Sequence, residues 1–268
     1  MSLIKQFFRP VLSLHLAPQQ LSGVLYRGGK LVSGSAFATA IDNPGGHWQV
    51  SLAALTRHLQ HLAQLQPGGA RPPLSVSLSS RWCRMALVPW SDALLSDSAA
   101  ARFLQTQLAA LYGDEARGWA IVADDAPYGQ PRLVCGIDSE LRQALQAAAA
   151  EHGHILRAVE PVVSVAGRAI AAKQPQAFAV IEAGRLVIAA VASGRITALQ
   201  SQPCPAAWHT ELQQAWRRWT LRTPALAQIQ DVLVIDVSGA APASTVLPSG
   251  FRHAAAPLAH LIRESAWA

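Results

Sequence analysis

Short apolar runs and one amphipathic helix alternate over residues 11–88 of the chain. The runs are rich in β-forming residues, and the pair Gly28–Gly29 supplies the positive φ that a tight hairpin turn requires. From Leu52 to Leu65, leucines recur at three- and four-residue steps, which predicts a helix capped by Ser51. The predicted elements are strands at 11–16, 21–26 and 31–40, a helix at 51–65, and strands at 74–79 and 83–88.

Helices become more frequent in the middle of the chain. Asp138 or Ser139 can cap one of them, and Glu140 lies in its first turn, where a carboxylate interacts favourably with the helix dipole. We interpret Asp124–Asp125, which precede the turn at 127–129, as part of that turn rather than as an acid/base pair. The predicted elements are a helix at 99–111, strands at 119–123 and 133–137, a helix at 139–152, a strand at 155–159 and a helix ending near 172.

The opening order of elements then returns. The order β-β-β-α-β of residues 11–79 occurs again over 177–237, after an offset of about 165 residues. We interpret this as one fold that is duplicated. The second copy is predicted to contain strands at 177–181, 185–192 and 195–200, a helix at 208–221, a strand at 232–237, and one more short helix within 251–267.

Composition narrows the class of protein. The 268 residues are 51% hydrophobic and only 14% charged, against a usual ~25% charged, which excludes a disordered or charged-tail protein. The net charge of +6 is the balance of 22 cations and 16 anions. Of the cations, 19 are arginine, a bias more typical of a GC-rich genome than of a nucleic-acid surface. The three cysteines, Cys83, Cys135 and Cys204, have no metal-binding or redox spacing, so we expect buried thiols in a reducing compartment and no metal site.

The N-terminal segment is short, apolar and basic. It has no cleavage site of a signal peptide, and no run of 18 apolar residues occurs in the chain, so no membrane span is expected. Leu3, Ile4, Phe7 and Phe8 fall at helical spacing beside two cations, and they could form a foot on a membrane surface or on a partner. The alternative is a short helix that caps its own domain.

A family resemblance joins these patterns. A duplicated β-hairpin, third strand, helix and strand resembles the ribonuclease-H-like core of the actin, hexokinase and Hsp70 superfamily. The start of the chain at 2–9, feeding into the strand at 11–16, is similar to PilM of type IV pilus assembly. The stretches Met85–Trp90, Leu133–Asp138 and Ala179–Val191 resemble the cytoplasmic part of GspL, the type II secretion relative.

This resemblance implies an α/β fold of two actin-like lobes, with mixed sheets and flanking helices. The first lobe would cover 1–172 and contain an inserted α/β subdomain at about 92–160. The second, shortened lobe would cover 173–268.

Actin-like ATPases carry an Asp-x-Gly phosphate loop in each lobe, whose acid positions magnesium or water and whose glycine lets the backbone approach the phosphates. At the matching positions this chain has His15 and Ala17 in the first loop, and Glu182 and Gly184 followed by Arg185 in the second. By resemblance we expect a degenerate site with no catalytic residue, and ATP and magnesium are disfavoured as cofactors. The alternative is that Glu182 and Arg185 are two solvated charges on an ordinary hairpin turn.

The resemblance also implies a role and partners. The chain would be a non-catalytic cytoplasmic scaffold, peripheral to the inner membrane, that connects PilN- or GspM-like platform proteins to a motor ATPase, and it could form a homodimer. Trp216, Arg217 and Arg218 are the best basic and aromatic cluster for a partner, although packing of the tryptophan with exposed arginines also explains them.

Two other functions are considered. A nucleotide-dependent enzyme of the same fold, such as an ATPase or a sugar kinase, is the alternative. A nucleic-acid role based on a ribonuclease-H-like catalytic core is disfavoured, because Asp42, Asp138 and Glu182 show no arrangement of clustered carboxylates that would hold metal ions. Salt-dependent DNA binding would support a version of this role that binds without catalysis.

Overall fold

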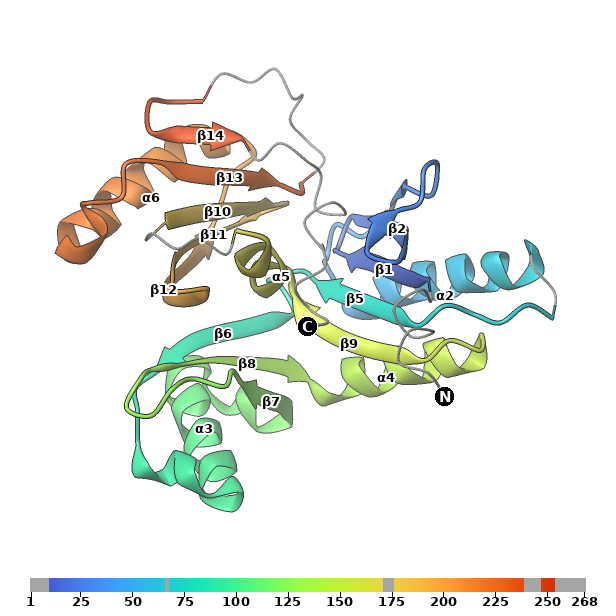
Figure 1. Ribbon diagram of the computed structural model, residues 1–268, viewed down its shortest axis with the longest axis horizontal. Coiled ribbons are helices and arrows are strands. Elements are labelled where there is room, and N and C mark those ends of the chain that lie inside the picture. The colour runs from blue at the N-terminus through green and yellow to red at the C-terminus, as the bar shows by residue number, and fades with distance from the viewer. Residues whose placement is uncertain (1–9, 66–67, 171–175, 239–246, 254–268) are drawn as a thin grey trace.

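Two β-sheets form the centres of two lobes (Figure 1). The structure is a computed structural model that describes residues 10–65, 68–170, 176–238 and 247–253. The first sheet contains β1 (Val11–Leu16), β2 (Gln20–Arg27), β3 (Lys30–Leu31), β4 (Phe37–Ala40), β5 (Leu74–Leu78) and β9 (Leu156–Pro161). The second contains β10 (Gln176–Glu182), β11 (Arg185–Ala192), β12 (Arg195–Pro203), β13 (Val232–Asp236) and β14 (Phe251–His253).

The two sheets share one strand order. The first runs β3-β2-β1-β5-β9, and the second runs β12-β11-β10-β13-β14. In each sheet the central strand pairs antiparallel with the strand that follows it and parallel with the strand that follows the helix. The predicted duplication is therefore confirmed, and it extends to a fifth strand that the order β-β-β-α-β did not include.

Helices flank the sheets: α2 (Trp48–Leu65), α4 (Ser139–Glu151), α5 (Val162–Ala169) and α6 (Trp208–Arg222). Each buries one apolar stripe, such as Leu55 and Leu59 of α2, or Leu212 and Ala215 of α6. The short helix α5 contacts strands of both sheets and so lies between the lobes. Among the described residues, no helix combines the length and the apolar character that a membrane crossing requires.

A third sheet forms an insert in the first lobe. It contains β6 (Cys83–Val88), β7 (Trp119–Ala123) and β8 (Arg132–Asp138) in the order β6-β8-β7, and α3 (Asp97–Tyr112) packs on it through Leu104 and Leu108. Short 3-10 turns lie at Asp92–Leu95, Asp114–Gly118 and Pro224–Leu226.

The insert differs from the predicted interval of about 92–160 at both ends. β6 precedes the interval, and β9 lies inside it but pairs with β5 of the first sheet. The alternation of side chains along a strand identifies the strand but not the sheet that it joins.

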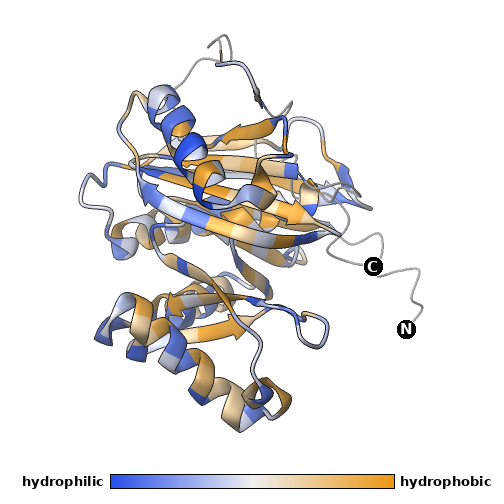
Figure 2. Ribbon diagram, turned by 90° about the vertical axis from the view of Figure 1, so that its left-hand side faces the viewer, coloured by the Kyte–Doolittle hydropathy of each residue, from blue (hydrophilic) through white to orange (hydrophobic). Residues whose placement is uncertain are grey.

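One hydrophobic core connects all three parts. A single cluster of buried side chains includes Leu14 and Leu78 of the first lobe, Ile137 of the insert, and Phe178 and Val180 of the second lobe. Figure 2 shows hydrophobic strands within the sheets, while hydrophilic residues colour the outward faces of the surrounding helices. The lobes are thus packed together rather than joined only by a linker.

Three predicted elements differ from the structure. The predicted strand at 31–40 is interrupted: β3 and β4 both pair with β2, and Ser35 leaves the sheet between them, donating from Oγ to the Val32 carbonyl at 2.6 Å. Helix α2 begins at Trp48, so Ser51 is not its cap; its buried hydroxyl donates to the Pro18 carbonyl instead. Within the predicted C-terminal helix, Phe251–His253 form β14, because they pair with β13, and residues 254–268 lie outside the described residues.

Candidate functional site between the lobes

A cleft lies where the two lobes meet. It encloses about 360 Å³ and is lined by Pro18, Asn43 and Arg81 of the first lobe and by Glu182, Gly184 and Trp208 of the second. The ends of β1, β5 and β10 converge there, because the parallel pairs β1–β5 and β10–β13 point their carboxyl ends toward it. This places both predicted phosphate loops at the same junction.

The first loop position is a buried, neutral histidine. His15 is 3% exposed, and its Nδ1 lies 3.1 Å from Oγ of Ser77. The Ser77 hydroxyl also lies 3.2 Å from the Leu14 carbonyl, to which it can donate, and a neutral His15 ring with its proton on Nδ1 then donates to Ser77. Its Nε2 is buried without a hydrogen-bond partner, and burial lowers the pKa of His15 to about 4. Ala17, also buried, continues this apolar end of β1.

The second loop position is a buried carboxylate that reaches across to the first lobe. Glu182 is 4% exposed, and its two oxygens lie 3.2 and 2.9 Å from the backbone nitrogen of Ser80, which donates to them. Burial raises the pKa of Glu182, and hydrogen bonds from Ser79 and Ser80 oppose this shift in part. The alternative of two solvated hairpin charges is therefore wrong for Glu182.

Gly184 and Arg185 complete the second hairpin. Gly184 has a φ of +77°, so glycine suits this turn position. The half-buried Arg185 donates from Nη1 to Oγ of Ser201 at 3.1 Å. Burial and the neighbouring Arg84 lower the pKa of Arg185, whereas Glu182 raises it. Arg185 therefore contributes positive charge beside the buried carboxylate.

The loop after β5 was not identified from the sequence. Ser79–Trp82 is folded tightly: the Trp82 amide donates to the Ser79 carbonyl at 3.0 Å, and the Arg81 amide donates to Oγ of Ser79 at 3.1 Å. Arg81 and Trp82 fasten the loop by donating to the carbonyls of Gly45 and Gly46. The available sequence signal was a strand that ends in two serines.

Two cysteine thiols and one aspartate near the cleft also make contacts within the protein. The Cys83 and Cys135 thiols are free and buried, and a hydrogen bond between them together with burial raises the pKa of Cys83. At the end of β13, Asp236 accepts from the amide of Ser238 at 2.9 Å. No group of three or more potential metal-ligating side chains occurs among the described residues.

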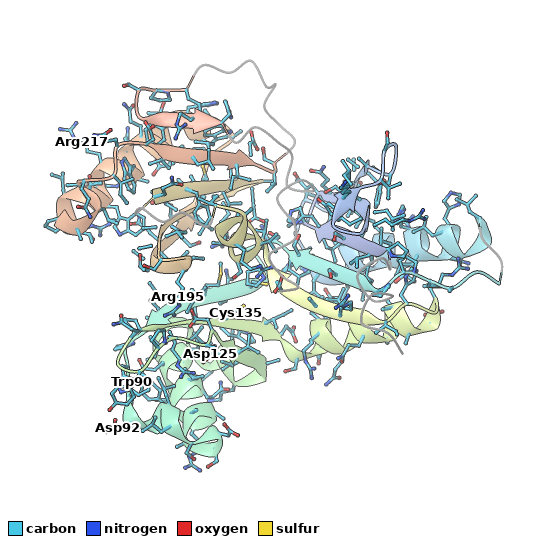
Figure 3. The ribbon with its side chains drawn as sticks, viewed as in Figure 1. Trp90, Asp92, Asp125, Cys135, Arg195 and Arg217 are labelled. Atoms are coloured by element: carbon cyan, nitrogen blue, oxygen red, sulfur yellow. The ribbon has the colours of Figure 1, made fainter. Side chains whose placement is uncertain are left out.

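The predicted partner cluster lies on α6, and none of its three residues lines this cleft. Trp216 packs edge-on against Trp219, with ring centroids 5.8 Å apart, and Arg218 pairs with Glu211 at 2.8 Å. Arg217 is exposed and points away from the molecule (Figure 3). The structure therefore does not bring these residues to the interlobe site. The predicted foot of Leu3, Ile4, Phe7 and Phe8 lies outside the described residues.

Similarity to known proteins is found at the level of structure. No family model matches the chain, and no curated protein matches its sequence. The cytoplasmic domain of EpsL, an inner membrane component of the type II secretion system of Vibrio cholerae, is similar over 94% of this chain and 92% of its own, with 12% identity and a TM-score of 0.57.

Two further structures are similar. A chain of the PilM–PilN type IV pilus biogenesis complex matches over 85% of this chain and 82% of its own, with 12% identity and a TM-score of 0.63. A Bacteroides thetaiotaomicron protein with actin-like ATPase fold and unknown function matches over 88% of this chain and 84% of its own, with 13% identity and a TM-score of 0.51. The chain therefore has the actin-like fold, and the expected likeness to PilM and GspL-type proteins is confirmed as a likeness of fold.

Proposed function

We propose that this chain is a non-catalytic scaffold of a type IV pilus or type II secretion assembly platform, acting at the cytoplasmic face of the inner membrane. The observation that carries the proposal is that both positions matching the phosphate-loop acids are committed to internal contacts. His15 is hydrogen-bonded to Ser77, and Glu182 accepts a hydrogen bond from the amide of Ser80. The likeness of fold to EpsL and to PilM supports the cellular setting.

The residues at the cleft do not fit a magnesium nucleotide. The charge of a triphosphate requires a metal ion, and that ion requires oxygen ligands, mostly carboxylates. The buried neutral ring of His15 offers no oxygen, and the carboxylate of Glu182 already accepts the Ser80 amide. No step of nucleotide hydrolysis is therefore assigned to this chain.

The proposed partners are membrane proteins of the PilN or GspM type, with a motor ATPase on the cytoplasmic side. A scaffold of this kind works by binding several proteins at once, so its surfaces matter more than its cleft. The exposed Arg217 on α6 is one candidate contact, because arginine is enriched at interface hot spots. Attachment at the inner membrane would be peripheral.

Two experiments test the proposal. Calorimetric titration of the purified chain with Mg-ATP should give no saturable heat; micromolar binding would contradict the non-catalytic assignment and favour an actin-like ATPase or a sugar kinase. Affinity purification from detergent-solubilised membranes of the native host should recover inner-membrane pilus or secretion proteins. Recovery of the chain alone, at native expression, would overturn the scaffold role.

A further inference from the structure

A buried carboxylate joins two parts of the chain that are 102 residues apart. Glu182 ends β10 in the second lobe, and Ser80 follows β5 in the first. Both carboxylate oxygens accept the same backbone N–H, at 3.2 and 2.9 Å. Carboxylates are costly to bury, so a carboxylate that persists at 4% exposure must receive compensating interactions.

The first lobe supplies these interactions through its backbone. The Ser79 amide donates to the Leu16 carbonyl at 3.0 Å, which fixes the loop to the end of β1. The next amide, that of Ser80, is not used within the first lobe and is directed at Glu182. The neighbouring Ser79 and Ser80 lower the pKa of the Glu182 carboxyl group, against the larger effect of burial. The loop thus directs a backbone N–H at the carboxylate, as an oxyanion-binding site does.

The second lobe holds the carboxylate in place. Glu182 and Arg185 are paired across the two-residue turn Ala183–Gly184, so the backbone that carries the carboxylate is fixed. The charged and titratable groups around it are Arg185 on its own hairpin and Cys83 at the start of β6, with Arg81 lining the same cleft. Arg185 favours the ionised carboxylate, and no second carboxylate is among the groups that affect its pKa.

We propose that the loop Ser79–Arg81 is an oxyanion-binding site whose ligand is the Glu182 carboxylate of the same chain, and that this internal ligand holds the two lobes together. In this arrangement the planar carboxylate presents both of its oxygens to one N–H. This inference does not depend on the proposed function, because it concerns how the lobes are held and not which proteins bind them.

The test removes the internal ligand and offers a free one. In the variant Glu182→Ala, the Ser80 amide should exchange with solvent at least about tenfold faster, which corresponds to the loss of a hydrogen bond to a charged group. Sodium formate should slow this exchange and raise the unfolding midpoint of the variant, relative to sodium chloride at the same ionic strength. The matched control is Glu211→Ala, which removes a surface carboxylate of the same lobe that pairs with Arg218.

The outcomes distinguish a loop that binds carboxylates from a Glu182 side chain that only fills space. The proposal stands if formate acts on Glu182→Ala alone and leaves the wild type and Glu211→Ala unchanged relative to chloride. It is overturned if the Ser80 amide exchanges at the wild-type rate in Glu182→Ala, or if formate stabilises all three proteins equally. Should Glu182→Ala fail to fold, Glu182→Leu fills the space of the side chain without an acceptor oxygen, and the same two measurements apply to it: unchanged Ser80 exchange in that variant likewise overturns the proposal.

Discussion

The guanidinium of Arg195 lies 2.6 Å from Oδ2 of Asp124 and thereby joins the second lobe to the insert. Arg195 begins β12, and Figure 3 shows it between the second lobe and the insert below it. The other oxygen of Asp124 accepts the amide of Leu133 at 2.9 Å, which closes the β7–β8 loop. The insert, which is covalently part of the first lobe, is thus also fastened to the second.

This ion pair predicts a measurable coupling. Because both side chains are partly exposed, at 26% and 30%, we expect a coupling free energy of only about 1 kcal/mol between Arg195→Gln and Asp124→Asn in a double-mutant cycle. Chemical denaturation measures the coupling, and amide exchange over 124–133 should increase in each single variant. Strictly additive effects of the two substitutions would contradict a direct pair.

His15 predicts loss of stability in acid. Its pKa is about 4 in the folded protein and 6.5 in the unfolded chain, so the unfolded state binds more protons between these values. The free energy of unfolding should therefore fall as the pH decreases from 6.5 to 4, by up to about 3 kcal/mol from this group. His15→Asn should remove this dependence, whereas the exposed His61→Asn should keep it. Urea unfolding at several pH values measures the free energy of unfolding of each variant. If the wild type and His15→Asn lose stability in parallel as the pH falls, the acid sensitivity does not come from His15.

Glu182 predicts a pH dependence of opposite sign. Burial raises its pKa above the ordinary value of 4.5, so the folded state binds the proton more tightly than the unfolded chain does. The stability that the wild type gains from this proton is complete below pH 4.5 and is lost as the pH rises through the raised folded pKa. Relative to Glu182→Gln, which does not titrate, the wild type should become less stable as the pH increases. Urea unfolding measures this, and a constant difference in the free energy of unfolding between the two proteins from pH 4 to 8 would contradict the raised pKa of Glu182.

Gly136 predicts a local packing limit in the insert. A Cβ at this position would lie 2.5 Å from the ring of Trp119 and 3.1 Å from Leu108, so Gly136→Ala should destabilise the protein by about 1–3 kcal/mol. Gly118→Ala is the matched control, because a Cβ there meets no atom within 4 Å. Denaturant unfolding compares the two variants. Equal stability of both would show that the Trp119 ring can move aside at no cost.

Local patterns predicted most strands and helices, because their signals lie within a few residues. The β-rich runs at 11–16 and 177–181 and the glycine pair at 28–29 are examples, and each is found where expected. The interruption near Ser35 was missed, since it depends on a side-chain hydrogen bond to a neighbouring backbone carbonyl. The three-residue strand β14 is too short to show a period.

The site was predicted only in part for a related reason. The sequence placed His15 and Glu182 at the matching loops, but the partners that decide their chemistry, Ser77 and Ser80, are 62 and 102 residues away. Those contacts depend on how two lobes meet, which no local pattern encodes. A solvated hairpin turn at Glu182 therefore stayed an alternative in the sequence, although tertiary packing buries the side chain.

The shared core has a thermodynamic consequence. Phe178 and Val180 belong to the same buried cluster as Leu14 and Leu78, so a fragment containing either half alone would leave part of that cluster in water. The halves are copies in topology, yet we expect neither to unfold as an independent cooperative unit. A calorimetric scan should therefore give one transition whose van't Hoff and calorimetric enthalpies agree.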